Sequence, residues 1–222
     1  DYHKEIYAQR YKADGTKDGD EFRVNTHYTT DQERPSVAAL NNGKFVIVWQ
    51  SDGQDGSYDG IYGQRYKADG TKDGSEFQVN GRTHLSQFGP SVAGLDNGKF
   101  VVAWTDGSST NVVYARRFNA DGTAMETLGF KVSEDTTGNQ ESPSIAGLGG
   151  GKFVVAWQSY DGQDGSLSMD VYAKRYKADG TNDGSEFRVN SETVLQHSAP
   201  SVTALDNGKF VVAWTGNGEI LA

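Results

Sequence analysis

The sequence predicts an all-β protein: a four-bladed β-propeller with four antiparallel strands in each blade. The first observation is a repeat that occurs four times, because Pro35, Pro90, Pro143 and Pro200 each open a similar segment and lie 55, 53 and 57 residues apart. The second is composition, since 28 glycines and 11% aromatic residues are typical of short strands joined by tight turns. The third is that the 34 residues before Pro35 and the 23 residues from Pro200 onward together make one period of 57 residues. We therefore expect a ring that is closed by pairing of the N- and C-terminal strands.

Each repeat contains four predicted strands, and their apolar content falls from the first to the fourth. In the first complete repeat, residues 36–40 are small and apolar, and residues 45–49 are apolar throughout, which predicts burial on both faces. Residues 61–66 mix apolar and polar side chains, and residues 76–80 alternate them, with Asn80 outward. Such alternation is typical of an exposed outer strand. The whole gradient is typical of a propeller blade, whose first strand lies near the centre of the ring.

Turns rich in Asn, Asp and Gly separate these strands. Asn41-Asn42-Gly43 joins the first predicted strand to the second, and Asp69-Gly70-Thr71 joins the third to the fourth. Because Asp-Gly alone favours a tight turn, we interpret these aspartates as turn formers and keep metal binding as the alternative. Arginines recur on the third strands beside glutamates of the fourth, which predicts surface ion pairs. The arginines are Arg10, Arg65, Arg117 and Arg175, and the glutamates are Glu21, Glu76 and Glu186.

The repeat predicts one domain over residues 1–222, since a ring of this size shares one continuous core. The expected blades are residues 35–89, 90–142, 143–199, and 200–222 completed by 1–34. The N-terminus carries no basic segment followed by an apolar one, so we expect a mature piece or a domain excised from a longer protein.

Charge and composition exclude several kinds of partner. The net charge of −9 disfavours nucleic acid and anionic membranes, which need clustered Lys and Arg. No segment approaches the roughly 20 apolar residues of a membrane span, so we expect no membrane insertion. The chain has no cysteine, which removes disulfides, thiolate metal sites and cysteine nucleophiles. We expect a monomer.

A resemblance to a known family rests on three motifs of the repeat. They are Ser51-Asp52-Gly53-Gln54-Asp55-Gly56-Ser57, residues 60–71, and Glu76-Phe77-Gln78-Val79-Asn80. The repeat resembles those of very large bacterial secreted and surface proteins of the RTX-adhesin type, over nearly the whole chain. The resemblance implies a secreted protein or one at the bacterial cell surface, in a calcium-rich environment, and it implies no catalytic activity.

Two loops carry the strongest candidates for metal ligands. Both contain Asp-Gly-Gln-Asp-Gly-Ser, in which short carboxylates and bare carbonyls can converge on Ca²⁺, an ion that takes about six to eight oxygen ligands. The predicted ligands are Asp52, Asp55, Asp59, Asp161, Asp164 and Asp170. The alternative is a pair of solvated Asp-Gly turns, and the other two repeats depart from the motif.

Further polar side chains are predicted on the face that carries the longer loops. The amides are Gln32, Gln87, Gln140 and Gln196, which stand three or four residues before each repeat proline. They either line the top of a central channel or, as we favour, form hydrogen bonds with the adjacent loop backbone. The acidic residues of this face are Asp31, Glu33 and Glu141.

These observations favour a non-catalytic, calcium-stabilised repeat module of a secreted or cell-surface adhesin. It would present one loop face to a glycan, a peptide or a neighbouring adhesin domain, and it would not be an enzyme. The first alternative is a purely structural spacer without a ligand. The second is a propeller enzyme that acts on polysaccharide, for which Asp31, Glu33 and Glu141 are the candidate residues. Such an enzyme needs a unique acid–base cluster, whereas most carboxylates here recur with the repeat or lie in turns.

Overall fold

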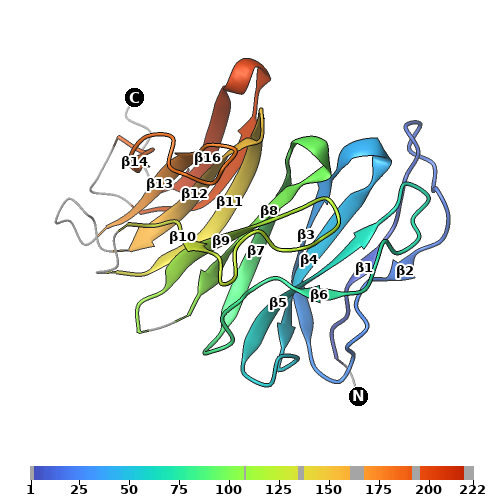
Figure 1. Ribbon diagram of the computed structural model, residues 1–222. Helices are drawn as coiled ribbons and strands as arrows, with labels where there is room; N and C mark the ends of the chain where they lie inside the picture. Colours follow the sequence, from blue (N-terminus) through green and yellow to red (C-terminus); the bar gives the residue numbers. More distant parts are fainter. Residues whose placement is uncertain (1–2, 108, 135–137, 161–167, 192–195, 218–222) are drawn as a thin grey trace.

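The protein is an arc of antiparallel sheets. The computed structural model describes residues 3–107, 109–134, 138–160, 168–191 and 196–217. Three four-stranded sheets stand side by side, with a two-stranded sheet at each end of the row (Figure 1). We call each four-stranded sheet a blade and each two-stranded sheet a half-blade. The described residues contain no helix that is long and apolar enough to cross a membrane.

The strands follow one another through the arc in chain order. The N-terminal half-blade contains β1 (Tyr7–Ala8) and β2 (Phe22–Arg23). Blade 1 contains β3 (Gln32–Ala39), β4 (Phe45–Asp52), β5 (Asp59–Tyr66) and β6 (Phe77–Gln78). Blade 2 contains β7 (Gln87–Gly94), β8 (Phe100–Asp106), β9 (Val112–Phe118) and β10 (Phe130–Lys131). Blade 3 contains β11 (Gln140–Gly149), β12 (Lys152–Tyr160), β13 (Met169–Tyr176) and β14 (Phe187–Arg188). The C-terminal half-blade contains β15 (His197–Ala204) and β16 (Phe210–Gly216).

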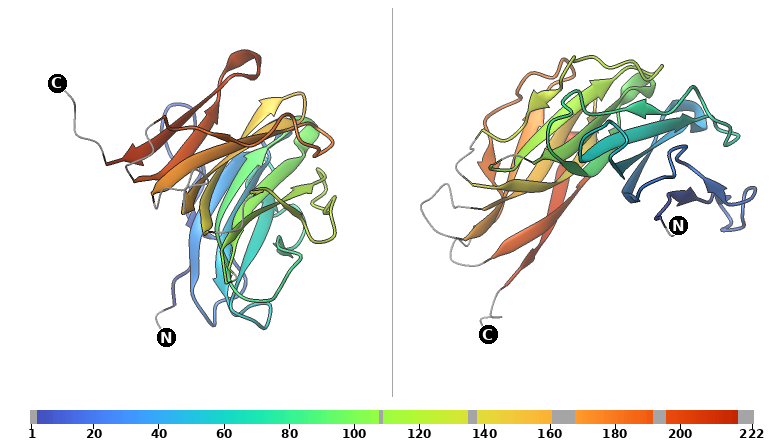
Figure 2. Two further views of the ribbon diagram at one scale, coloured as in Figure 1. Left: turned by 90° about the vertical axis from the view of Figure 1, so that its left-hand side faces the viewer. Right: turned by 90° about the horizontal axis from the view of Figure 1, so that it is seen from below.

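The two ends of the arc do not meet. Among the described residues, β1 pairs only with β2 and β16 pairs only with β15, and Figures 1 and 2 show these sheets at opposite ends. The all-β class and the four-stranded antiparallel sheets are confirmed, but the expected pairing of the N- and C-terminal strands is not formed. Each half-blade packs on its own neighbour: Ile6 and Val24 are buried against blade 1, and Val202 is buried against blade 3.

The second strand of each blade forms the core, as the sequence predicts. Trp49, Trp104 and Trp157 are fully buried on β4, β8 and β12. Rings of the third strand stack on rings of the second, with centroids 4.8 to 4.9 Å apart. The stacked pairs are Phe45–Tyr66, Phe100–Phe118 and Phe153–Tyr176. Each aromatic side chain buries about 150–250 Å², so these pairs contribute much of the stability of a blade.

Neighbouring blades are joined by contacts that recur along the arc. On the inner strands, the Ser36 hydroxyl accepts a hydrogen bond from the Val92 N–H of the next blade at 3.2 Å. On the outer strands, the Phe77 ring packs on Phe118 of the next blade, with centroids 5.6 Å apart. The equivalent ring pairs at two other boundaries are Phe22–Tyr66 and Phe130–Tyr176. These contacts fix how one blade sits on the next.

Arginines of the third strand also bind the next blade. Arg65 Nη1 donates to the Ala120 carbonyl at 2.7 Å and lies 3.1 Å from a carboxylate oxygen of Asp73. The equivalent donations run from Arg10 to Ala68 and from Arg117 to Ala178. The expected Arg65–Glu76 ion pair is wrong, because Glu76 accepts hydrogen bonds from the Gln54 amide and from Thr26 of the preceding half-blade.

The inner strand is longer than predicted because it continues through the proline by means of a bulge. β3 begins at Gln32, and its register with β4 shifts between Glu33 and Ser36. The residue before each repeat proline has a positive φ: 52° at Arg34, 62° at Gly89, 54° at Ser142 and 51° at Ala199. This conformation costs a non-glycine residue about 1–2 kcal/mol, so the packing of the inner strands must hold it in place.

The outer strand is shorter than predicted, with two residues in each blade. Asn80, expected to point outward, is buried, and its Oδ1 accepts a hydrogen bond from the Ile61 N–H at 2.8 Å. Asn25 and Asn190 do the same for Ile6 and Val171. At these positions a buried asparagine therefore accepts a hydrogen bond from the backbone N–H that has no strand partner where the outer strand ends.

The first prediction concerns the arginine contact between blades. Replacing Arg65 with Ala removes the donation to Ala120 and the ion pair with Asp73 from a residue that is 9% exposed. Hydrogen bonds to charged groups contribute about 1.5–3 kcal/mol, so we expect that loss in the free energy of unfolding, measured in urea on a dilute sample. Arg175→Ala is the matched control, because Arg175 is exposed at the same repeat position, and it should change stability by less than about 0.5 kcal/mol. Equal losses in both variants would contradict the contact.

A second prediction concerns the turn between the third and fourth strands. The Asp69 carboxylate accepts hydrogen bonds from the Thr71 hydroxyl at 2.7 Å and the Thr71 N–H at 2.8 Å, which lower the pKa of Asp69 below its usual value. A lowered folded-state pKa stabilises the fold above the ordinary carboxyl pKa, and this stability is lost as the pH falls through the lowered value. Asp69→Ala should therefore lower the urea midpoint at neutral pH, with a difference that fades in acid. The exposed Asp20 supplies the control substitution, Asp20→Ala, and a pH-independent effect of Asp69→Ala would contradict the prediction.

Candidate functional site

One face of the arc gathers the longer loops. In blade 1, the Asp52 N–H donates to the Asp31 carbonyl at 3.0 Å, which joins the loop after the second strand to the segment before the first. The same bond joins Gly107 to Ser86 in blade 2 and Tyr160 to Asn139 in blade 3. We call this face the loop face.

Three of the four glutamines predicted on the loop face, Gln32, Gln87 and Gln140, are buried inside the blades, whereas Gln196 is exposed. Gln32 Nε2 donates to the Thr30 carbonyl at 3.2 Å, and its Oε1 accepts from Trp49 Nε1 at 3.2 Å. Gln140 makes the same two bonds in blade 3. In the C-terminal half-blade the corresponding position belongs to His197 and not to Gln196, since His197 accepts from Trp214. These side chains support the loops, as the favoured interpretation predicts, and do not line a channel.

The predicted acidic residues lie on different blades. Glu33 forms an ion pair with Lys4, and the Asn111 amide donates to Glu141. Asp31 accepts a hydrogen bond from the Lys4 N–H at 3.1 Å, which lowers the pKa of Asp31. Because β7 lies between β3 and β11 in the row of inner strands, Glu33 and Glu141 belong to different boundaries between blades. The structure does not bring these three acids together.

The first predicted calcium loop is held by protein groups. Asp55 accepts hydrogen bonds from the Ser57 N–H at 3.1 Å and from the Gln78 amide at 3.0 Å. Asp52 and Asp59 lie opposite each other as partners of β4 and β5. Within the described ranges, no group of three or more His, Cys, Asp or Glu side chains is placed to hold a metal ion.

In the second predicted calcium loop, Asp161 and Asp164 lie outside the described residues. Asp170 is buried, and its Oδ1 accepts a hydrogen bond from the Asn190 amide at 2.6 Å. Calcium at this loop stays a prediction.

Asp106 is a candidate functional residue that the repeat pattern alone does not reveal. It lies opposite Gln87 at the end of β8, a position that is Ser51 in blade 1 and Ser159 in blade 3. Asp106 is 8% exposed, and its Oδ2 has no hydrogen-bond partner among the described residues. Burial raises the pKa of Asp106, although the charge of Arg82 opposes the shift. The sequence signal is a carboxylate where the other blades have serine.

A hollow of about 420 Å³ opens beside Asp106. It is lined by residues 81–85, which lead from blade 1 to blade 2, and by Leu128. Arg82 lies over the Tyr114 ring, with its ζ carbon 4.7 Å from the centroid. Leu85 has a φ of 67°, which is rare for a bulky residue and typical of strained segments at functional sites. The volume lies in the range of small-ligand sites.

Two buried polar atoms on the same face of β8 have no hydrogen-bond partner among the described residues. They are Trp104 Nε1 and Asp106 Oδ2, which share a face because side chains two residues apart on a strand point the same way. In blades 1 and 3 the equivalent tryptophans donate to Gln32 and Gln140. In blade 2 the equivalent Gln87 instead accepts from the Asn80 amide at 2.8 Å. Buried groups of this kind are usually satisfied by water or a ligand, so they indicate a site that is completed from solution.

An aromatic ring and a guanidinium group lie near Gly107, the residue after Asp106. A Cβ added at Gly107, the residue after Asp106, would be 3.5 Å from the Phe88 ring. Arg34 of blade 1 lies over the same ring, with its ζ carbon 5.9 Å from the centroid. The ring and the guanidinium therefore lie together at the boundary of blades 1 and 2, on the loop face, beside the residue that follows Asp106.

Solved structures with a similar fold are arabinanases and arabinofuranosidases. The α-L-arabinanase of Penicillium chrysogenum, in complex with arabinobiose, matches with a TM-score of 0.64 and 15% identity over 97% of this chain and 70% of its own. The endo-arabinase of Bacteroides thetaiotaomicron matches with a TM-score of 0.56 and 16% identity, over 87% of this chain and 74% of its own. The GH93 α-L-arabinofuranosidase of Fusarium graminearum, also in complex with arabinobiose, matches with a TM-score of 0.55 and 16% identity, over 87% of this chain and 63% of its own. No protein-family model matches the sequence, and no curated protein matches it. At identities this low, the likeness establishes a propeller-like fold.

These neighbours contradict the interpretation of the chain as an RTX-adhesin repeat. The proteins that share its fold are arabinan-degrading enzymes, so the non-catalytic adhesin module and the expectation that the chain is not an enzyme are both overturned. The physical reason is that the motifs behind the resemblance contain Asp-Gly pairs, which form tight turns in many unrelated proteins. Asp69 and Asp55 accept hydrogen bonds from residues two positions further on, as Asp-Gly turns do in unrelated proteins.

The third prediction tests the burial of Asp106. A raised folded-state pKa means that the fold becomes less stable, relative to the unfolded chain, as the pH rises above the ordinary carboxyl pKa. Asp106→Asn removes this charge, so the variant should unfold at a higher urea midpoint than the unmodified chain at neutral pH. At about pH 3, below the usual aspartate value, the two midpoints should converge. A variant that is less stable at neutral pH would show that the Asp106 carboxylate is stabilised, by Arg82 above all.

Proposed function

We propose that this chain is a glycoside hydrolase of propeller fold that acts on arabinose-containing polysaccharide, with its site at the Asp106 hollow. The observation that carries the proposal is Asp106 itself, a buried carboxyl group that breaks the repeat beside a hollow of suitable size. The substrate class is supported by the solved neighbours, two of which hold arabinobiose.

Asp106 is assigned as the general acid. Glycoside hydrolysis requires a carboxylic acid that protonates the departing oxygen as the glycosidic C–O bond breaks. Burial raises the pKa of Asp106 and so keeps its proton to a higher pH. Its Oδ2, which has no protein partner among the described residues, is the atom from which the proton passes to the leaving sugar.

Asp59 is assigned as the second carboxylate. One carboxylate must activate a water molecule or attack the anomeric carbon while the acid protonates the leaving group. Lys4 and Asn111 stand at one repeat position, just before the third strand, and each reaches the inner strand of the following blade. Asp59 occupies this position in blade 1, and the residue of blade 2 that corresponds to Glu33 and Glu141 is Phe88.

Phe88, Arg34 and Arg82 are assigned to substrate binding. The C–H face of a sugar ring packs on an aromatic ring, and sugar hydroxyls accept hydrogen bonds from guanidinium groups. Phe88 and Arg34 already lie together, and Arg82 lines the hollow beside Asp106. Arg82 therefore supplies donors beside the acid, and Phe88 with Arg34 supplies a stacking surface and donors at the same boundary between blades.

Two expectations from the sequence, localisation outside the cell and closure of a four-bladed ring, bear on this function. Secretion or display at the cell surface stays part of it, because polysaccharide substrates are met outside the cell. The closed four-bladed ring is not part of it, because the site is formed at the boundary of blades 1 and 2 and β1 and β16 pair only within their half-blades.

The fourth prediction is an activity assay. The chain should release reducing ends from arabinan, and Asp106→Asn and Asp59→Asn should each lower kcat by about 100-fold to 10,000-fold, the range expected for loss of general acid or base catalysis. The exposed Asp20 again supplies the control, since Asp20→Asn should leave the rate unchanged. Binding of arabino-oligosaccharides by the two impaired variants should persist, which separates lost chemistry from lost binding.

Two results would contradict this proposal. If the unmodified chain binds arabino-oligosaccharides but releases no reducing ends, the loop face is a sugar-binding surface without catalysis. If Asp106→Asn keeps the full rate, the acid lies elsewhere.

A further inference from the structure

The contacts that join the blades each have an unused half at the two ends of the arc. The serine–amide bond of the inner strands occurs at three boundaries, as Ser36–Val92, Ser91–Ile145 and Ser144–Val202. The next serine in the series, Ser201, is exposed in the C-terminal half-blade. The amide that would begin the series belongs to Val37, whose residue is 66% exposed. Acceptor and donor of a fourth bond therefore lie at opposite ends of the molecule.

The arginine contact shows the same division. A Cβ added at Gly70 would be 2.6 Å from the Arg10 guanidinium, which covers this turn in blade 1. Gly15 is the corresponding glycine of the N-terminal half-blade, and no atom lies within 4 Å of a Cβ added there. At the other end, Arg175 is exposed. The C-terminal end thus offers a guanidinium, and the N-terminal end offers an uncovered turn with the Ala13 carbonyl.

Aromatic rings are exposed at both ends at positions that are buried or half-buried in the complete blades. Tyr7 and Tyr11 of the N-terminal half-blade are 58% and 62% exposed, while Trp214 at the C-terminal end is 38% exposed. Phe187 of blade 3, which has no following ring to pack on among the described residues, is 39% exposed. Of the equivalent rings in complete blades, Tyr62, Tyr172, Tyr66, Tyr176, Trp49, Trp104 and Trp157 are buried, and Tyr114, Phe77 and Phe130 are half-buried. Each end therefore exposes the rings that the other end would cover.

The register of the second and third strands in the complete blades shows how β16 would pair with β1. In every blade the tryptophan of the second strand lies opposite an aromatic residue of the third, as Trp49 does opposite Tyr62. Counting along the repeat, Trp214 lies opposite Tyr7 when β16 pairs with β1. The same register places Phe210 opposite Tyr11, the position of the ring stack that recurs in blades 1, 2 and 3.

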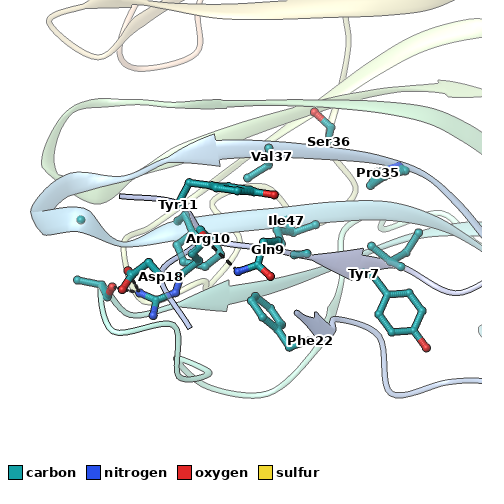
Figure 3. Close-up of a pocket in the computed structure, with 15 residues that line it drawn as sticks. Tyr7, Gln9, Arg10, Tyr11, Asp18, Phe22, Pro35, Ser36, Val37 and Ile47 are labelled. Atoms are coloured by element: carbon teal, nitrogen blue, oxygen red, sulfur yellow. Dashed lines mark hydrogen bonds and ion pairs between the residues drawn. The ribbon is translucent and has the colours of Figure 1, made fainter. Parts of the chain in front are cut away.

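The N-terminal end also has space for the missing strands. A hollow of about 560 Å³ lies between the N-terminal half-blade and blade 1. Figure 3 shows Tyr11 and Phe22 of the half-blade around it, with Val37 and Ile47 of blade 1 on its other side. In a complete blade, the first and second strands lie beside the third and fourth in this way. The hollow therefore has the place and the apolar lining that β15–β16 would need.

We propose that β15–β16 of one molecule docks beside β1–β2 of a second copy and completes a four-stranded blade between them. The occupant is a second copy because the two half-blades lie at opposite ends of the arc and do not reach each other (Figure 2). Backbone pairing of the two exposed edges adds hydrogen bonds to the side-chain contacts. The contact is head to tail, so copies join into a closed ring or a longer row. This assembly replaces the monomer expected from the sequence.

The test is sedimentation equilibrium with two blocked variants. Tyr11→Asp places a charge at the N-terminal end, and Trp214→Asp places one at the C-terminal end; both residues are exposed in the single chain, so both variants should fold. The unmodified chain should associate as its concentration rises, and each variant alone should stay monomeric. An equimolar mixture of the two variants should form a one-to-one heterodimer, because one unblocked end of each remains.

Tryptophan quenching provides an independent readout. Trp49, Trp104 and Trp157 are 0% exposed, so quenching by iodide reports on Trp214. Quenching of the unmodified chain should fall severalfold on association, whereas Tyr11→Asp alone should stay quenchable at every concentration.

The matched control is Tyr58→Asp, which alters an equally exposed tyrosine (65%) in the loop between β4 and β5. This variant should associate like the unmodified chain. An unmodified chain that stays monomeric at all concentrations, or a mixture of blocked variants without heterodimer, would overturn the proposal. If the chain is monomeric and its Trp214 is protected from iodide, β15–β16 pairs with β1–β2 of the same chain, which would also overturn the proposal.

Discussion

The packing of one blade on the next is the interaction on which the rest of the structure depends. Strands such as β8 are buried on both faces, which a single sheet cannot achieve alone. The serine–amide bond, the arginine donation and the ring contact each occur at three of the four boundaries, and all three occur at the two boundaries between complete blades. The stability of such an arc is close to a sum of blade and boundary contributions. The unused halves of these blade-to-blade contacts therefore lie at the two ends.

The candidate site is a consequence of the same packing. Asp106 is buried because residues 81–85, which carry the chain from blade 1 to blade 2, cover the end of β8. Its raised pKa follows from that burial. Phe88 and Arg34 meet for a related reason, since they stand on neighbouring inner strands where the bulge turns the backbone. A regular scaffold thus produces one irregular place through a few departures from the repeat.

Local features of this fold can be predicted from the sequence, and features that depend on the angle between blades cannot. The buried second strands and the Asp69 turn follow from periodicity and turn chemistry, which act within a few residues. Ring closure depends on the rotation between neighbouring blades, and no local sequence pattern predicts that rotation. The Ala120 partner of Arg65 is 55 residues away in the chain. Asp106 could be noticed only as a departure from serine, because its burial comes from a segment of the preceding blade.

Amide hydrogen exchange, followed residue by residue by NMR in a dilute sample, tests most directly whether this contact between blades builds the arc. The amides of Val92, Ile145 and Val202 each donate to a serine of the preceding blade, while Val37 occupies the same position with no blade before it. The account predicts slow exchange at the first three amides and exchange at the rate of an open amide at Val37. Protection of Val37 equal to that of the other three, in a sample shown to be monomeric, would contradict the account.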